Sequence, residues 1–226
     1  MDGESSEARI PPEDNSDRSA LLSGLPDVAL ARLLRLVTRL VVREPDAELV
    51  ELLDRPDVRM VMTALAPGLP AWLDPRVAAL KAGDPAALAE LLEADAEAFA
   101  ALFLLPEGCR PLAGAWTDRA EAVAASAHQT LGRLGRERDG PMGRLPLDHL
   151  GLHTELAAEQ LESSDPELRQ GARELARRDL GDWAGAFGGR VLVAETTPLN
   201  KALGALVAAL FPMPPKPVDP AEVQHL

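Results

Sequence analysis

The hydrophobic residues of the first patterned stretch recur at steps of three and four, which is the spacing of one face of an α-helix. Glu44-Pro45-Asp46 interrupts this pattern, and two shorter apolar stretches follow at 49–53 and 58–65, the second ending near Pro67-Gly68. We therefore expect three amphipathic helices in the first third of the chain. The apolar face of the first, within residues 26–42, consists of Leu30, Leu33, Leu34, Val37, Leu40 and Val41.

Four later helices are predicted from a polar residue followed directly by proline. The polar side chain accepts a backbone N–H that would otherwise be unpaired, and proline at the first helical position loses no hydrogen bond. Each pair precedes apolar residues at helical spacing, so each predicts a helix start. The pairs are Asp74-Pro75, Asp84-Pro85, Asp165-Pro166 and Thr197-Pro198.

The remaining pattern predicts helices separated by loops rich in proline and glycine. The helix from Asp84 is expected to run to Phe103, and a long loop with Pro106, Gly108, Pro111 and Gly114 follows it. Further helices are expected after Thr117, around residues 147–163, and over 183–193, where the best strand candidate, 190–193, fits a helix equally well. The sequence thus predicts an all-α fold, a single helical-bundle domain with a long central loop. We expect it over 23–212, between a disordered acidic leader (1–22) and a proline-rich tail (213–226).

Composition and net charge support the helical fold and exclude several classes of function. The aromatic share is 3%, and the apolar content rests on Ala and Leu, which favour helices. A formal net charge of -13 argues against nucleic acid and against anionic membrane surfaces as partners. The leader lacks the basic region and the apolar region that a secretory signal contains. No apolar run in the sequence approaches the ~20 residues of a membrane span. With a single cysteine, Cys109, these features predict a cytoplasmic protein without membrane insertion.

The segment 145–156 holds the candidate chemistry of the chain. Asp148 lies at an expected helix start, and His149 and His153, four residues apart, share a helix face. One interpretation is a metal site built from these three residues, which would make the protein a metal-dependent hydrolase. The simpler interpretation is two partly exposed histidines on an ordinary helix, and we favour it because nothing resembles a H-E-x-x-H motif.

A second interpretation of the same segment is recognition of a partner. Asp148 and His149 would line a cleft at the helix start, beside an apolar patch. The alternative is that Asp148 caps the helix and His149 is a satisfied surface residue, and residue chemistry alone favours this alternative. Trp116 lies beside the proline- and glycine-rich loop, where its ring is a candidate for an accessible aromatic surface.

The order of short motifs resembles that of the TorD/DmsD chaperones over roughly residues 27–212. The segment Pro146-Leu147-Asp148-His149-Leu150, with Glu155-Leu156 after it, is similar to the E-P-x-D-H-L-x-x-E-L signature of that family. Ala101-Leu102-Phe103-Leu104 and the stretch from Pro111 to Arg119 look like its L-F loop and its S-V-[WY]-x-[DS] element. Trp183 with Phe187, and the segment 198–204, resemble its closing helices, while Leu145, Leu199 and Asn200 depart from the family pattern.

The resemblance implies a non-enzymatic chaperone without a cofactor of its own. Such relatives bind the twin-arginine signal peptide, and often the body, of a molybdopterin-containing oxidoreductase, and they hold it in the cytoplasm until its cofactor is inserted. A twin-arginine leader combines cations with an apolar stretch, which suits an acidic protein with an apolar groove. The peptide-binding residues that we expect on this basis are Trp116, Leu145, Pro146, Leu147, Asp148, His149 and Glu155.

Several alternatives stay open on the sequence alone. The metal-dependent hydrolase using Asp148, His149 and His153 is one, and a helical regulatory scaffold without a signal-peptide partner is another. The resemblance also leaves open the identity of the client, whether that client is exported, and whether guanine nucleotide binds. The long loops permit either a monomer or a domain-swapped homodimer.

Overall fold

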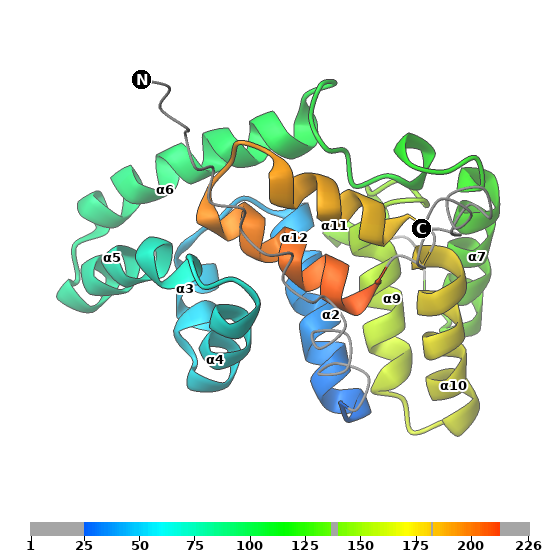
Figure 1. Cartoon of the computed structure of the whole chain (residues 1–226). Helices are drawn as coiled ribbons and strands as arrows, with labels where there is room; N and C mark the ends of the chain where they lie inside the picture. Colours follow the sequence, from blue (N-terminus) through cyan, green and yellow to red (C-terminus); the bar gives the residue numbers. More distant parts are fainter. Residues whose placement is uncertain (1–24, 137–139, 182, 213–226) are drawn as a thin grey trace, which may run out of the picture.

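The computed structural model describes residues 25–136, 140–181 and 183–212 (Figure 1). These residues form helices and turns with no strand among them, so the prediction of an all-α, single-domain fold is confirmed. The predicted leader (1–22) and tail (213–226) lie outside the described residues. No helix in the described part of the chain is both long and apolar enough to cross a membrane.

The helices follow the predicted pattern closely. The first half of the chain contains α2 (Asp27–Val42), α3 (Ala47–Asp54), α4 (Pro56–Leu65), α5 (Leu69–Ala82) and α6 (Pro85–Phe99). The second half contains α7 (Ala120–Arg133), the single turn α8 (Gly140–Gly143), α9 (Leu150–Leu161), α10 (Pro166–Leu175), α11 (Ala184–Val193) and α12 (Pro198–Leu210). The ambiguous segment 190–193 is therefore helical, as the last turn of α11.

Three of the four predicted proline-containing helix starts are confirmed. Asp84, Asp165 and Thr197 each precede the first helical residue, and each side chain accepts a backbone N–H of the first turn. The fourth prediction is wrong, because Pro75 lies inside α5, which already begins at Leu69. Leu69, Trp72 and Leu73 are buried before it, and this burial outweighs the single backbone hydrogen bond that an internal proline removes.

Two helices continue through a turn of π-helix. α6 runs on into Ala100–Leu104, and α10 runs on into Ala176–Leu180. The first continuation confirms the expected extent of the helix that Asp84 caps. It ends at Leu104, and the long central loop begins with Leu105. The loop holds one turn of 3-10 helix at Ala113–Ala115 and leads into α7. Thr117 does not cap α7; its hydroxyl instead accepts the backbone N–H of Arg119, two residues later.

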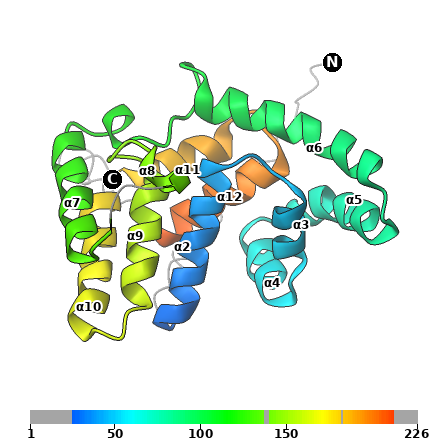
Figure 2. The ribbon, with the colours of Figure 1, turned by 180° about the vertical axis from the view of Figure 1, so that it is seen from behind.

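The helices gather around α2, α9, α11 and α12. α2 and α9 lie side by side, and α11 and α12 pack closely against each other across them (Figures 1 and 2). α3, α4 and α5 lie on one side of this centre, and α7 and α10 lie on the other, beyond α9 (Figure 2). Trp183 and Phe187 are fully buried in the core that joins these elements.

The α11–α12 contact has glycine on both helices. A Cβ atom added at Gly188 would lie 2.9 Å from the backbone nitrogen of Ala208 and 2.9 Å from the carbonyl oxygen of Gly204. A Cβ atom added at Gly204 would lie 2.8 Å from the carbonyl oxygen of Gly188. The two backbones therefore approach so closely that neither position has room for a side chain.

Candidate functional site

The central loop is joined to the start of α9 by a short backbone pairing. Leu112 and His149 form an isolated antiparallel bridge. The backbone N–H of Ala113 donates to the carbonyl of Asp148 at 3.0 Å, and that of Leu150 donates to the carbonyl of Pro111 at 2.8 Å. We call residues 111–114 and 147–150, joined in this way, the clasp. It connects two segments that are more than thirty positions apart in the chain.

Asp148 holds the clasp with its side chain as well as its backbone. Its Oδ2 atom accepts the backbone N–H of Gly114 at 3.1 Å. The interpretation of Asp148 as a helix cap is wrong, because α9 begins at Leu150 and the residue before it, His149, is the cap. Asp148 is half-buried, and no hydrogen-bond partner of its Oδ1 atom is seen among the described residues. That oxygen can accept hydrogen bonds from a cationic ligand.

His149 and His153 are buried, so the expectation of two partly exposed histidines is wrong. Nδ1 of His149 accepts the backbone N–H of Gly151 at 3.0 Å, which caps α9. Nε2 of His153 lies 2.9 Å from the carbonyl oxygen of Leu147 and donates to it. Desolvation lowers the pKa of His149 from 6.5 to about 4 and also lowers the pKa of His153. Both rings are therefore neutral near pH 7 and are committed to the backbone.

The three residues before Asp148 divide between the interior and the surface. Leu145 and Leu147 pack on a small apolar cluster between α7 and α9 that contains Leu131 and Leu156. Pro146 is exposed, and its carbonyl accepts the backbone N–H of His149 at 3.1 Å. Of these three residues only Pro146 is exposed to a ligand, whereas the two leucines are half-buried.

Trp116 lies two residues after the clasp segment 111–114. Its indole Nε1–H donates to the carbonyl of Arg110 at 2.7 Å, and its ring packs edge-to-face on Phe187 with 5.9 Å between ring centroids. The ring is half-buried, so one part of it is anchored on the core and another part reaches solvent. Such a fixed, partly exposed aromatic is suited to contact an apolar segment.

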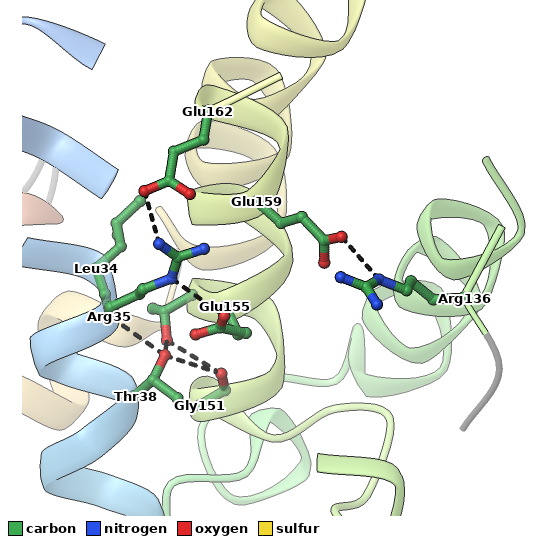
Figure 3. A network of polar contacts seen from close by, with 9 residues as sticks. Leu34, Arg35, Thr38, Arg136, Gly151, Glu155, Glu159 and Glu162 are labelled. Atoms are coloured by element: carbon green, nitrogen blue, oxygen red, sulfur yellow. Dashed lines mark hydrogen bonds and ion pairs between the residues drawn. The ribbon is translucent and has the colours of Figure 1, made fainter. Parts of the chain in front are cut away.

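Glu155 lies on a different side of α9, facing α2. Its carboxylate accepts a hydrogen bond from Nε of Arg35 at 3.2 Å, and Glu162 pairs with the same guanidinium at 2.6 Å (Figure 3). The hydroxyls of Thr38 and Thr154 meet at 2.8 Å beneath these ion pairs. The structure thus places Glu155 in the α2–α9 contact, where Arg35 pairs with its charge. Glu155 therefore does not form one site with the side chain of Asp148.

The described residues contain no group of three or more His, Cys, Asp and Glu side chains that could hold a metal ion. Asp148, His149 and His153 therefore do not converge as the hydrolase interpretation requires. The sequence did not indicate that Arg76 is buried. It also gave no sign of a groove beside α2, which is described below. Comparison with family models, with curated proteins and with solved structures finds no match to this chain.

Proposed function

We propose that this chain is a non-enzymatic, cytoplasmic chaperone of the TorD/DmsD kind. It would bind the twin-arginine signal peptide, or the apo form, of a molybdopterin-containing oxidoreductase and delay export until the cofactor is inserted. The observation that supports this most is the clasp. It joins residues 147–150 to residues 111–114, and each of these lies in a stretch on which the resemblance to that family rests.

The chemistry around the clasp fits a peptide that carries both cations and apolar residues. The Oδ1 atom of Asp148 is the acceptor offered to a guanidinium of the peptide, and charge-assisted hydrogen bonds of this kind are among the stronger ones. Pro146 and the outer part of the Trp116 ring supply apolar contact beside the two segments that the clasp joins. The net charge of -13 speeds encounter with a cationic leader. The client, not this chain, carries the molybdopterin cofactor.

Calorimetric titration with twin-arginine signal peptides from molybdoenzymes of the same genome tests this proposal. Saturable binding to one peptide, lost when its two arginines are replaced by alanine, is the expected result. Binding that persists without the arginines would argue for a general apolar-peptide site. If none of the peptides binds, the twin-arginine function is overturned, and the helical scaffold becomes the better interpretation.

Substitution of Asp148 separates its charge from its role in the clasp. Asp148→Asn keeps an oxygen that can accept the N–H of Gly114 but removes the negative charge, whereas Asp148→Ala removes both. We expect both variants to bind the signal peptide about tenfold more weakly, because a charged partner is lost. Asp118→Asn, at an exposed acid between the clasp loop and α7, is the matched control. Equal binding by the wild type and Asp148→Asn would remove the carboxylate from the site.

A further inference from the structure

An open groove lies between α2 and α4. Its volume is about 800 Å³. The residues that line its floor are apolar and come from both helices. On α2 they are Ala29, Leu33 and Leu36, and on α4 they are Val58, Val61 and Leu65. We call this feature the α2–α4 groove.

The shape of the groove fits a helix. Its lining on α2 extends from Ala29 to Arg39, which corresponds to about 15 Å of helix, or almost three turns. Both walls present residues at steps of three and four, the spacing into which the apolar face of another helix packs. At the edge of the groove Met60 is 70% exposed, and unbranched Met side chains adapt well to helical ligands.

The edge of the groove is rich in arginine, although the protein as a whole is acidic. Arg32, Arg35 and Arg39 follow one another along α2 over about 10 Å, and Arg55 lies across from them at the start of α4. Among the described residues that line the groove, the only acid is Asp57, which pairs with Arg55 at 3.3 Å.

Two of the three arginines on α2 are held in place by acids of this chain. Glu155 and Glu162 bind Arg35, and Asp46 binds Arg39. Arg32 is exposed, and no ion pair of its side chain is seen within the described residues. It is therefore the cation most available to an incoming carboxylate, and Arg35, whose side chain is 42% exposed, lies beside it on the same edge.

We propose that the α2–α4 groove docks an amphipathic helix of a partner protein, with carboxylates flanking its apolar face. A row of arginines over two turns matches acids spaced along a helix, whereas an amphiphile with one anionic head would meet only one end of that row. The groove is lined by α2 and α4, whereas the clasp consists of residues 111–114 and 147–150, so the two surfaces are distinct. The proposal stands independently of the proposed function.

Synthetic helical peptides test the groove directly. The probe is a fluorescein-labelled peptide of sixteen residues, ~24 Å as a helix, with Leu on one face and Glu at the flanking positions. The controls are the same peptide with Lys in place of Glu and a scrambled acidic peptide. In fluorescence anisotropy titrations with the full chain, we expect the acidic amphipathic peptide to bind at least about tenfold more tightly than either control, and to weaken as salt is added.

Variants of the groove assign the binding to its residues. Met60→Asp places a charge at an exposed apolar position, and we expect it to weaken the acidic peptide about tenfold without loss of helicity. Arg32→Glu is expected to reverse the preference toward the Lys peptide. Val193→Asp, at a position of α11 that is 73% exposed and outside the groove, is the matched control and leaves binding unchanged.

Three outcomes would overturn the proposal. The first is that no peptide binds, or that all three bind equally. The second is that Met60→Asp and Arg32→Glu bind like the Val193→Asp control. The third is a concentration-dependent dimer in sedimentation experiments that Met60→Asp abolishes, which would make a second copy of this chain the occupant. Binding of twin-arginine peptides is measured separately, so its failure and that of the groove are distinguishable.

Discussion

His149 is a residue whose protonation is tied to the fold. Its Nδ1 atom caps α9 only while that nitrogen is unprotonated, and burial lowers its pKa from 6.5 to about 4. The unfolded chain binds the proton more readily, so between these two values the folded state loses stability as the pH falls. The full contribution, roughly 3 kcal/mol, is present above pH 6.5 and is lost as the pH approaches 4. His153, also with a lowered pKa, acts in the same direction.

We expect His149→Asn to reduce this dependence, and His153 to supply the part that remains. Asn keeps a side-chain oxygen that can cap α9 but carries no titrating proton. Urea unfolding followed by circular dichroism between about pH 4.5 and 7.5 measures the slope of the unfolding free energy against pH. His128→Asn, at an exposed histidine of α7, should retain the slope of the wild type. If His149→Asn keeps that slope as well, His149 is not the source of the pH dependence.

At the scale of elements, α5 and α6 are joined by a buried ion pair. Nε of Arg76 donates to Asp95 at 2.9 Å, and the indole N–H of Trp72 donates to the other oxygen of Asp95 at 2.8 Å. Arg76 also donates to the carbonyl oxygens of Trp72 and Leu91, and its guanidinium lies 4.2 Å from the centre of the Trp72 ring. Every charged group at this contact therefore has partners, which is the condition for burying it.

Asp95→Ala is expected to lower the unfolding free energy by about 3–5 kcal/mol, because it leaves the charge of Arg76 buried without its partner. The measurement is denaturant unfolding followed by far-UV circular dichroism. Asp74→Ala removes an exposed carboxylate of α5 that pairs with Arg59, and it should cost much less. A similar loss of unfolding free energy in both variants would show that the buried ion pair contributes no more to stability than an exposed one.

The elements that sequence could predict are those with local signals. Asp84, Asp165 and Thr197 cap helices through their own first turns, so each signal and its effect lie within three residues. Pro75 gave the wrong start because the burial of the preceding turn, a tertiary effect, prevailed over a local preference. His149 took the cap that Asp148 was expected to form, since the loop 111–114 engages Asp148 from elsewhere in the chain.

The candidate sites depend on contacts that a linear pattern does not contain. The clasp pairs Leu112 with His149, and the α2–α4 groove exists only because α4 stands apart from α2. The sequence did indicate the stretch around Asp148 as unusual, but it could not show that Glu155 turns away toward Arg35. Helical periodicity predicts which residues share one face of a helix, but it does not predict which element packs against that face.

At the scale of the whole molecule, α12 joins elements from both halves of the chain, because it contacts α2, α4, α5 and α11. Its closest approach is to α11 at Gly188 and Gly204. We expect Gly188→Ala to lower the global unfolding free energy by about 1–3 kcal/mol, because the new methyl group meets backbone atoms that cannot yield easily. A single unfolding transition with an unchanged m-value, at a lower denaturant midpoint, is the expected observation.

The adjacent glycine is a matched control for this prediction. A Cβ atom at Gly189 would have no neighbour within 4 Å. Gly189→Ala should therefore be neutral or stabilising by up to about 1 kcal/mol, because alanine favours the helix. If Gly188→Ala is also neutral or stabilising, then α11 and α12 are not in close contact at this crossing.

The glycine contact has a consequence for how this sequence can change over generations. In most cores a larger residue on one helix is compensated by a smaller one opposite, so the pair drifts together. Here Gly188 and Gly204 are both already the smallest residue, and the atoms opposite each include backbone that no substitution can shrink. No second-site exchange can accommodate a side chain at either position without moving a helix. Among descendants of this chain that keep the fold, these two positions should stay glycine while their neighbours vary.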